Sequence, residues 1–213
     1  MLFDDGYADA ATAVMNAAVA KNSESEQSLG IIFASSLVPP FLFLWRHHIE
    51  LRLKEVLGLG YEKVEELELN ELPPGTSKWE FATGQVLDYS TYNKVVRSHN
   101  LLQMWQLARP FIDWCWANKN DLKSMPLPKL HPDDARKLIL KLHEVDPHGD
   151  GVRYTKTRKG RYTLGSLREI DLEHTDHTMR LISEFLSWVS WEVGREMRGV
   201  GALKLMFRGQ DGD

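Results

Sequence analysis

The sequence contains a single cysteine, Cys115, among its 213 residues. One cysteine excludes a disulfide within the chain and a zinc site built on cysteines, and it fits a reducing cytoplasm. Because Cys115 stands between two tryptophans in the segment IDWCWAN, we expect it to be a buried structural thiol and not a nucleophile.

An excess of positive charge is also missing. The formal net charge is −4 and the pI is about 6.1, so the chain lacks the overall basic character of many nucleic-acid-binding domains. Any contact with nucleic acid must therefore come from a local patch.

The short motifs that hold nucleotides or activate a serine are absent too. The chain contains no P-loop, no G-x-G-x-x-G and no G-x-S-x-G. The segment 146–151 imitates the opening of an EF-hand loop, but Thr157 stands where that loop needs a glutamate. The pair His174 and His177 has no identifiable distant ligand to complete a zinc site. The sequence predicts neither a cofactor nor a metal ion.

One long stretch, residues 28–45, carries no charge and must be weighed as a membrane span. It is interrupted by Gly30, by two serines and by Pro39-Pro40, and Arg46-His47-His48 follows it at once. Two buried helical pieces of a soluble core explain this pattern better than a span does.

The chain length and the pattern of apolar residues predict one mainly α domain over residues 1–213, an up-and-down helical bundle with a small β-hairpin. Proline, glycine and capping residues divide the sequence into expected helices. These are at 8–21, from about 22 to 38, 40–57 (ended by Gly58 and Gly60), 98–118, 132–145 and 171–198, the last being the longest. An irregular or β excursion is expected at about 61–90 and the hairpin at about 152–164.

The helix after Pro40 places charged residues beside its apolar run. Arg46, Glu50 and Lys54 follow at four-residue steps and share one face, and His47 lies three residues before Glu50. One interpretation is an ion ladder on a partly exposed stripe. The other is a site in which Glu50 orients Arg46 or His47 for phosphate binding or proton transfer.

A second polar group opens the helix SHNLLQMW. His99 is expected in its first turn, with Ser98 or Asn100 as the cap. A helix N-terminus attracts anions, although a histidine there can simply cap or pack. Because both helices have wide apolar faces, we expect them to pack together. Arg46, His47, Glu50 and His99 would then form one polar pocket and are the candidate catalytic residues.

The predicted hairpin is the one basic patch of the sequence. It carries five positive charges in the nine residues 153–161, with no acidic residue among them. Tyr154 lies within this run and Tyr162 directly after it. One interpretation is that the basic residues contact phosphates while the tyrosines stack on bases. The other is a solvated hairpin whose charged residues protect its strand edges from pairing with other chains. The two explain this pattern about equally well. The candidate nucleic-acid-binding residues are Arg153, Lys156, Arg158, Lys159 and Arg161.

The segments PPFLFLWRHHIELRLK (39–54), RSHNLLQMW (97–105) and DPHGDGVRYT (146–155), followed by a long last helix, together resemble the HEPN superfamily. They are most similar to bacterial members with an R-H-x-x-E-L-x-x-K helix and a later H-N-L-x-x-L-W helix. The resemblance covers roughly residues 25–195. It implies a four- or five-helix bundle that is often dimeric.

Many members of this superfamily are metal-independent ribonucleases of toxin–antitoxin, CRISPR or phage-defence systems, and others only bind nucleotides or partner proteins. Catalytic members use an R-x(4–6)-H motif within one helix, in which arginine stabilises phosphate charge and histidine moves a proton. Here Arg168 and His174 have this spacing but straddle the expected start of the last helix. The resemblance therefore implies either an RNA- or nucleotide-directed protein or a non-catalytic interaction domain.

Overall fold

A computed structural model describes residues 5–23, 37–65, 78, 89–120, 125–149 and 170–196. The described residues contain helices and no strand, which confirms the prediction of a mainly α helical bundle. The helices are α1 (Asp5–Ser23), α2 (Val38–Glu65), α4 (Tyr89–Arg97), α5 (Leu101–Ala117), α6 (Pro132–Val145) and α7 (Leu172–Glu196).

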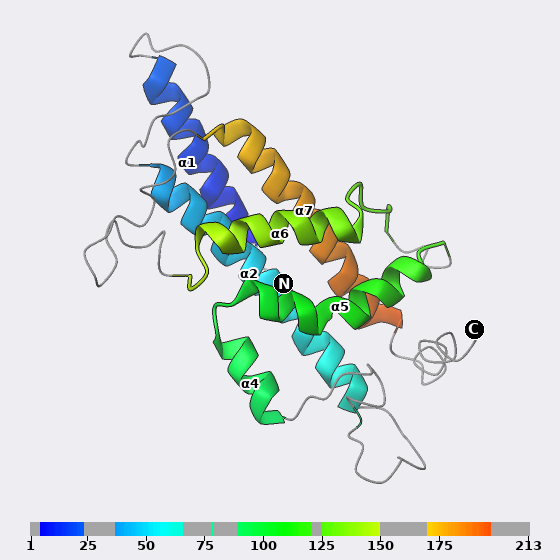
Figure 1. The fold of residues 1–213 in the computed structure, drawn as a ribbon. Helices are drawn as coiled ribbons and strands as arrows, with labels where there is room; N and C mark the ends of the chain where they lie inside the picture. The colour runs from blue at the N-terminus through cyan, green and yellow to red at the C-terminus, as the bar shows by residue number, and fades with distance from the viewer. Residues whose placement is uncertain are drawn as a thin grey trace.

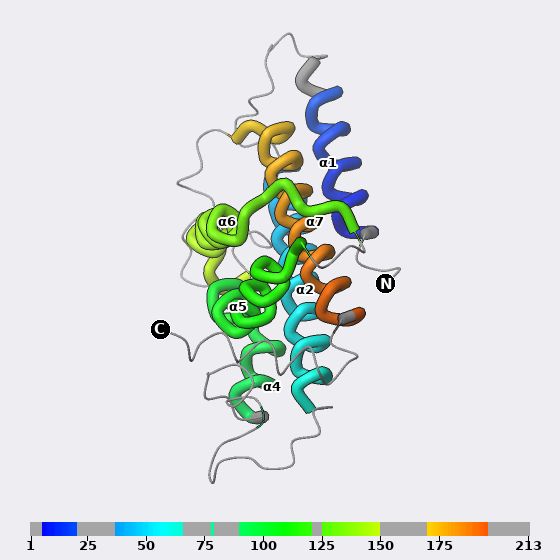
Figure 2. Tube along the Cα trace, turned by 90° about the vertical axis from the view of Figure 1, so that its right-hand side faces the viewer, coloured from blue at the N-terminus to red at the C-terminus, as the bar shows by residue number. Residues whose placement is uncertain are grey.

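Helices α1, α2 and α7 lie side by side, and α5 and α6 lie across one face of this layer (Figure 1). The view turned by 90° shows α5 and α6 nearly end-on while the other three run along the long axis (Figure 2). Helix α2 is central because it packs against α1, α5 and α7. Helix α4 leads into α5 and meets α2 through the stacked rings of Tyr92 and Tyr61.

The core is mainly aliphatic, and its largest side chains are aromatic residues of the three helices that meet at the centre. The fully buried tryptophans are Trp45 of α2, Trp105 of α5 and Trp188 of α7. Burying a large apolar side chain contributes about 1.5–3 kcal/mol, so these helices hold one another in place. Cys115 is buried among them, as predicted, and burial followed by the nearby charge of Glu192 raises the pKa of its thiol.

Helix α2 is longer than the sequence predicts. The expected end at Gly58 and Gly60 is wrong, because the helix continues to Glu65. A Cβ atom on Gly60 would lie 2.6 Å from the ring of Phe111, so this glycine allows α2 and α5 to approach closely. With 28 residues against 25 for α7, α2 is the longest described helix. The prediction that the last helix is longest is wrong for this part of the chain.

The other helix boundaries agree better with the sequence. The expected helix at 132–145 is α6, whose N-cap His131 accepts the backbone N–H of Asp133. Helix α7 begins after Asp171, whose carboxylate accepts the N–H of His174. The excursion predicted at 61–90 is wrong at both ends, because residues 61–65 belong to α2 and residues 89–90 to α4, a helix that the sequence analysis did not predict. Most of the rest of that segment, the predicted hairpin at 152–164 and the expected helix before Leu37 lie outside the described residues.

The described helices include none that is both long enough and apolar enough to cross a membrane. Residues 28–36, the first half of the uncharged stretch, lie outside the described part of the chain.

Candidate functional site

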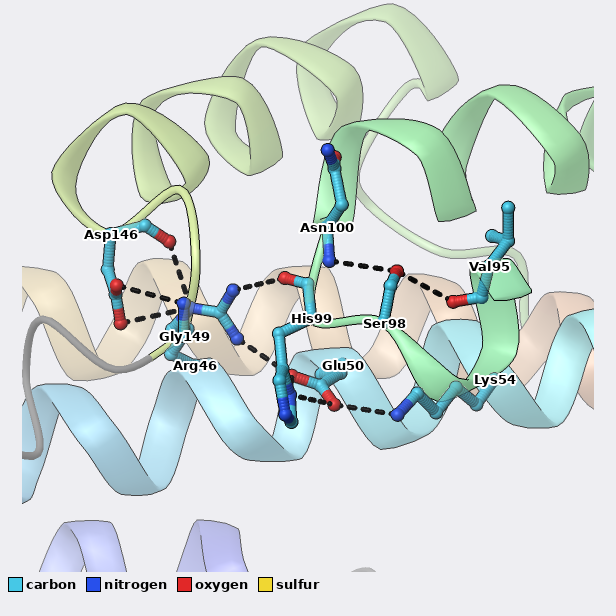
Figure 3. Close-up of polar contacts among 9 residues, drawn as sticks. All are labelled: Arg46, Glu50, Lys54, Val95, Ser98, His99, Asn100, Asp146 and Gly149. Atoms are coloured by element: carbon cyan, nitrogen blue, oxygen red, sulfur yellow. Dashed lines mark hydrogen bonds and ion pairs between the residues drawn. The ribbon is translucent and has the colours of Figure 1, made fainter. Parts of the chain in front are cut away.

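Three charged side chains of α2 form one row on the face that meets the start of α5 (Figure 3). Arg46, Glu50 and Lys54 are separated by single helical turns, as the sequence predicts. Lys54 donates to Glu50 Oε1 at 2.8 Å, and Arg46 Nη1 donates to Oε2 at 2.8 Å. The side chains of Arg46 and Glu50 are only 3% and 1% exposed, so this is a buried ion cluster and not a surface ladder.

His99 lies in the short turn that joins α4 to α5. Ser98 closes α4 by donating to the carbonyl of Val95 at 2.8 Å, and Asn100 caps α5 by accepting the N–H of Gln103 at 3.0 Å. The predicted packing of this segment on the Arg46 helix is confirmed. The predicted place of His99 in the first helical turn is wrong, since Asn100 is the N-cap and His99 precedes it.

Arg46 connects three segments of the chain. Its Nη1 binds Glu50, its Nη2 donates to the carbonyl of His99, and its Nε donates to the carbonyl of Asp146 at 3.2 Å. Nε also lies 3.3 Å from Oδ2 of Asp146. Because every guanidinium nitrogen has an acceptor inside the protein, Arg46 positions the other residues and does not face outward to bind a phosphate.

The carboxylate of Glu50 holds the ring of His99 through Nδ1. The Nδ1 of His99 lies 2.9 Å and 3.0 Å from the two carboxylate oxygens. An ionised carboxylate can only accept, so Nδ1 carries the hydrogen and Nε2 of the neutral ring carries a lone pair. The side chain of His99 is 43% exposed. A buried acid therefore orients a histidine that reaches the surface.

The ionised state of Glu50 follows from its surroundings. Burial raises its pKa, but hydrogen bonds from Lys54 and His99 and their charges outweigh this, and the pKa falls below its ordinary value. Glu50 is thus a carboxylate at neutral pH. We name the set of Arg46, Glu50, Lys54, His99 and Asp146 the Arg46 network.

The turn after α6 completes the Arg46 network from a distant part of the sequence. Asp146 Oδ1 accepts the N–H of Gly149 at 2.9 Å, and Gly149 adopts the left-handed conformation with φ of +73°. A Cβ atom there would lie 2.8 Å from Cβ of His99 and 3.1 Å from Cζ of Arg46. Only glycine lets this turn lie against both residues.

His47 does not join the site, contrary to expectation. Its ring stacks on Phe43 with centroids 5.7 Å apart and meets Tyr7 of α1 edge-on at 4.7 Å. One residue along a helix rotates the side chain by about 100°, which turns His47 towards α1 while Arg46 and Glu50 face α5. The predicted pocket therefore gathers Arg46, Glu50 and His99 without His47.

Most of the other sequence-based candidates lie outside the described residues. The basic residues Arg153, Lys156, Arg158, Lys159 and Arg161 are all outside the described residues, as is Arg168. His174 is exposed in the first turn of α7.

Sequence reasoning missed His143, in the last turn of α6. The charges of Arg46, Asp146 and His148 all act on its imidazole, so it lies beside the Arg46 network. The signal was present in the sequence, because Arg136 and His143 are separated by six residues within one helix. That spacing satisfies R-x(4–6)-H and brings both side chains to the same side of α6.

Comparison with known proteins adds no further assignment, since no family model, curated protein or solved structure matches the chain. What the site can do follows from its geometry. It offers an exposed imidazole whose orientation is fixed by a buried carboxylate, which is the arrangement that general acid–base chemistry requires.

Proposed function

We propose that this is a HEPN-like protein of the prokaryotic cytoplasm that binds RNA or a nucleotide and cleaves RNA without a metal ion. It would serve a defence or toxin module, as a homodimer or with a protein partner. The observation that supports this most is the Glu50–His99 pair, in which a buried carboxylate directs an exposed histidine. The resemblance of segments 39–54 and 97–105 to HEPN helices supports the choice of RNA.

In the proposed reaction, Nε2 of His99 accepts the proton of a ribose 2′-hydroxyl. The 2′-oxygen then bonds to the adjacent phosphorus and the bond from phosphorus to the 5′-oxygen breaks. The leaving 5′-oxygen takes a proton from water, and the imidazolium of His99 gives its proton back to the solvent. Glu50 keeps the ring oriented and stabilises the imidazolium that forms, as the acid of a catalytic triad does. The basic residues at 153–161 are proposed to hold the phosphate backbone.

The experiment is an RNA-cleavage assay over a panel of RNAs, with and without a chelator. We expect cleavage that survives the chelator and that falls about a hundredfold or more in His99→Gln, the usual scale for a positioned acid or base. The matched control is His177→Gln, which changes an exposed histidine of α7 and should leave the rate unchanged.

Two results would count against this assignment. No product above a buffer blank would reject ribonuclease activity. Cleavage that survives His99→Gln would move the chemistry to another pair at the R-x(4–6)-H spacing, and Arg136 with His143 would be substituted next, followed by Arg168 with His174.

A non-catalytic interaction domain is the second candidate, favoured by the geometry of Arg46. An arginine that serves a phosphate usually presents its fork to the ligand, whereas Arg46 is 3% exposed and bonded to the protein through all three nitrogens. If this candidate is right, His99→Gln will leave the biological output of the protein intact. RNA binding will then also be absent at low salt, where phosphate contacts are strongest.

A further inference from the structure

His143 occupies an unusual position at the end of α6. Its Nδ1 is buried, and it has no hydrogen-bond partner in the described part of the chain. The turn that begins three residues later binds Arg46 through the carbonyl of Asp146 and touches His99 through Gly149. The imidazole therefore lies at the base of the turn that completes the Arg46 network.

A proton on this imidazole would be poorly accommodated. Nδ1 would then carry a hydrogen, giving a buried N–H that has no acceptor among the described residues, which is unfavourable. The proton would also add a positive charge near the guanidinium of Arg46, which is itself buried and cannot move into solvent.

The charged groups around His143 come from three places. Arg46 approaches from α2, Asp146 and His148 from the turn, and Glu144 from α6 itself. Helices α5 and α7 also pack against α6, and the charges named here come from α2, from the turn and from α6 itself. The burial of the ring, then the charges of Arg46 and His148, outweigh the two acids and lower the pKa of His143.

We propose that the 146–149 turn is attached to Arg46 most firmly while His143 is neutral, so that mild acid weakens this attachment and with it the contact between the turn and His99. Release of the turn would regulate the candidate site described above. The proposal rests on the proposed function only for the consequence to activity, because attachment of the turn can be measured without any substrate.

The direction of the pH effect follows from linkage. The pKa of His143 is below its ordinary value of 6.5 when the turn is attached, and we expect it to return towards that value when the turn opens. Attachment is therefore at full strength above about pH 6.5, weakens as the pH falls below it, and stops weakening once the attached form is itself protonated. Between those limits the equilibrium shifts by up to about tenfold per pH unit.

The test uses the full chain and two NMR measurements. The first is hydrogen exchange of the Gly149 amide, which is bonded to Asp146, measured from pH 8 to pH 5 and corrected for the intrinsic exchange rate. We expect protection to be constant at the alkaline end and to fall by up to about tenfold per pH unit below about pH 6.5. His143→Gln should remove this dependence, and the control His177→Gln should retain it.

The second measurement reads the protonation of His143 directly in the unaltered chain, from its ring nitrogen shifts. At pH 6.5 an exposed histidine is about half protonated, and we expect His143 to remain largely neutral. This result decides the matter even if His143→Gln does not fold. Each of three results would overturn the proposal. His143 could be largely protonated at or above pH 6.5, the protection of the Gly149 amide could be the same at every pH, or its pH dependence could persist in His143→Gln. Failure to cleave RNA would leave it standing.

Discussion

Two buried polar networks meet α2 on different sides, and they begin at neighbouring residues. Arg46 belongs to the Arg46 network, whereas the indole of Trp45 donates to Asp176 of α7 at 3.0 Å. Asp176 also accepts from Thr12 of α1 at 3.0 Å and from Arg180 at 2.9 Å. We name the set of Thr12, Trp45, Asp176 and Arg180 the Asp176 network.

The two networks differ in the donors that surround the central carboxylate. Asp176 is surrounded by a hydroxyl, an indole and a guanidinium, which keep their protons at any pH at which proteins work. Glu50 has an imidazole among its donors, and that ring reaches solvent. The Asp176 network can therefore only hold α1 and α7 on α2, while the Arg46 network can also pass a proton between the protein and a ligand.

Removing the carboxylate should affect the Arg46 network most. In Glu50→Ala, Lys54 can turn outward because it is 24% exposed, but Arg46 stays buried and loses the carboxylate bonded to its Nη1, keeping only that of Asp146. Breaking a buried ion pair costs about 3–5 kcal/mol, and we expect this loss in the free energy of unfolding measured with urea. The control Glu62→Ala changes an exposed residue of the same helix and should stay within about 0.5 kcal/mol.

The matched deletion Asp176→Ala sharpens the comparison. Arg180 is 42% exposed and can be hydrated, so the remaining cost is the lost acceptor of Trp45 and Thr12, about 1–3 kcal/mol. If Asp176→Ala loses as much unfolding free energy as Glu50→Ala or more, the two networks do not differ in how strongly they depend on their carboxylate.

The contribution of Glu50 to stability should also depend on pH. The pKa of Glu50 is lowered from 4.5, so its stabilisation is complete above about pH 4.5 and is lost as the pH falls through its folded-state pKa.

Gly149→Ala should break the contact between the turn and His99. The added Cβ would require a left-handed alanine and would collide with Cβ of His99, and together these effects cost about 2–4 kcal/mol of unfolding free energy. Gly58→Ala is the matched control, because nothing lies within 4 Å of a Cβ at that helical position. There we expect a gain of about 0.5–1 kcal/mol. A gain at both glycines would exclude tight packing of the turn.

The sequence predicted the parts of this arrangement that depend on local patterns. The wide apolar faces of the two helices were sufficient to predict that they pack together, and the four-residue spacing was sufficient to place Arg46 and Glu50 on one face. The continuation of α2 past Gly60 could not be predicted, because it depends on the ring of Phe111 from another helix.

Long-range partners were beyond sequence reasoning as well. No spacing rule connects Arg46 to Asp146, which is a hundred residues away. His47 was misplaced for a related reason, since the neighbour that decides its direction, Tyr7, comes from α1.

The smallest effect on stability is expected at the residue with the largest proposed role. In His99→Gln, the amide of glutamine can still donate to Glu50, and the replaced side chain is 43% exposed. Exposed polar pairs contribute about 0–1 kcal/mol, so urea unfolding should change by less than about 1 kcal/mol. A loss of more than about 3 kcal/mol would mean that His99 supports the fold as Arg46 does. The two networks would then differ in position only, and a fall in RNA cleavage in this variant could no longer be assigned to proton transfer.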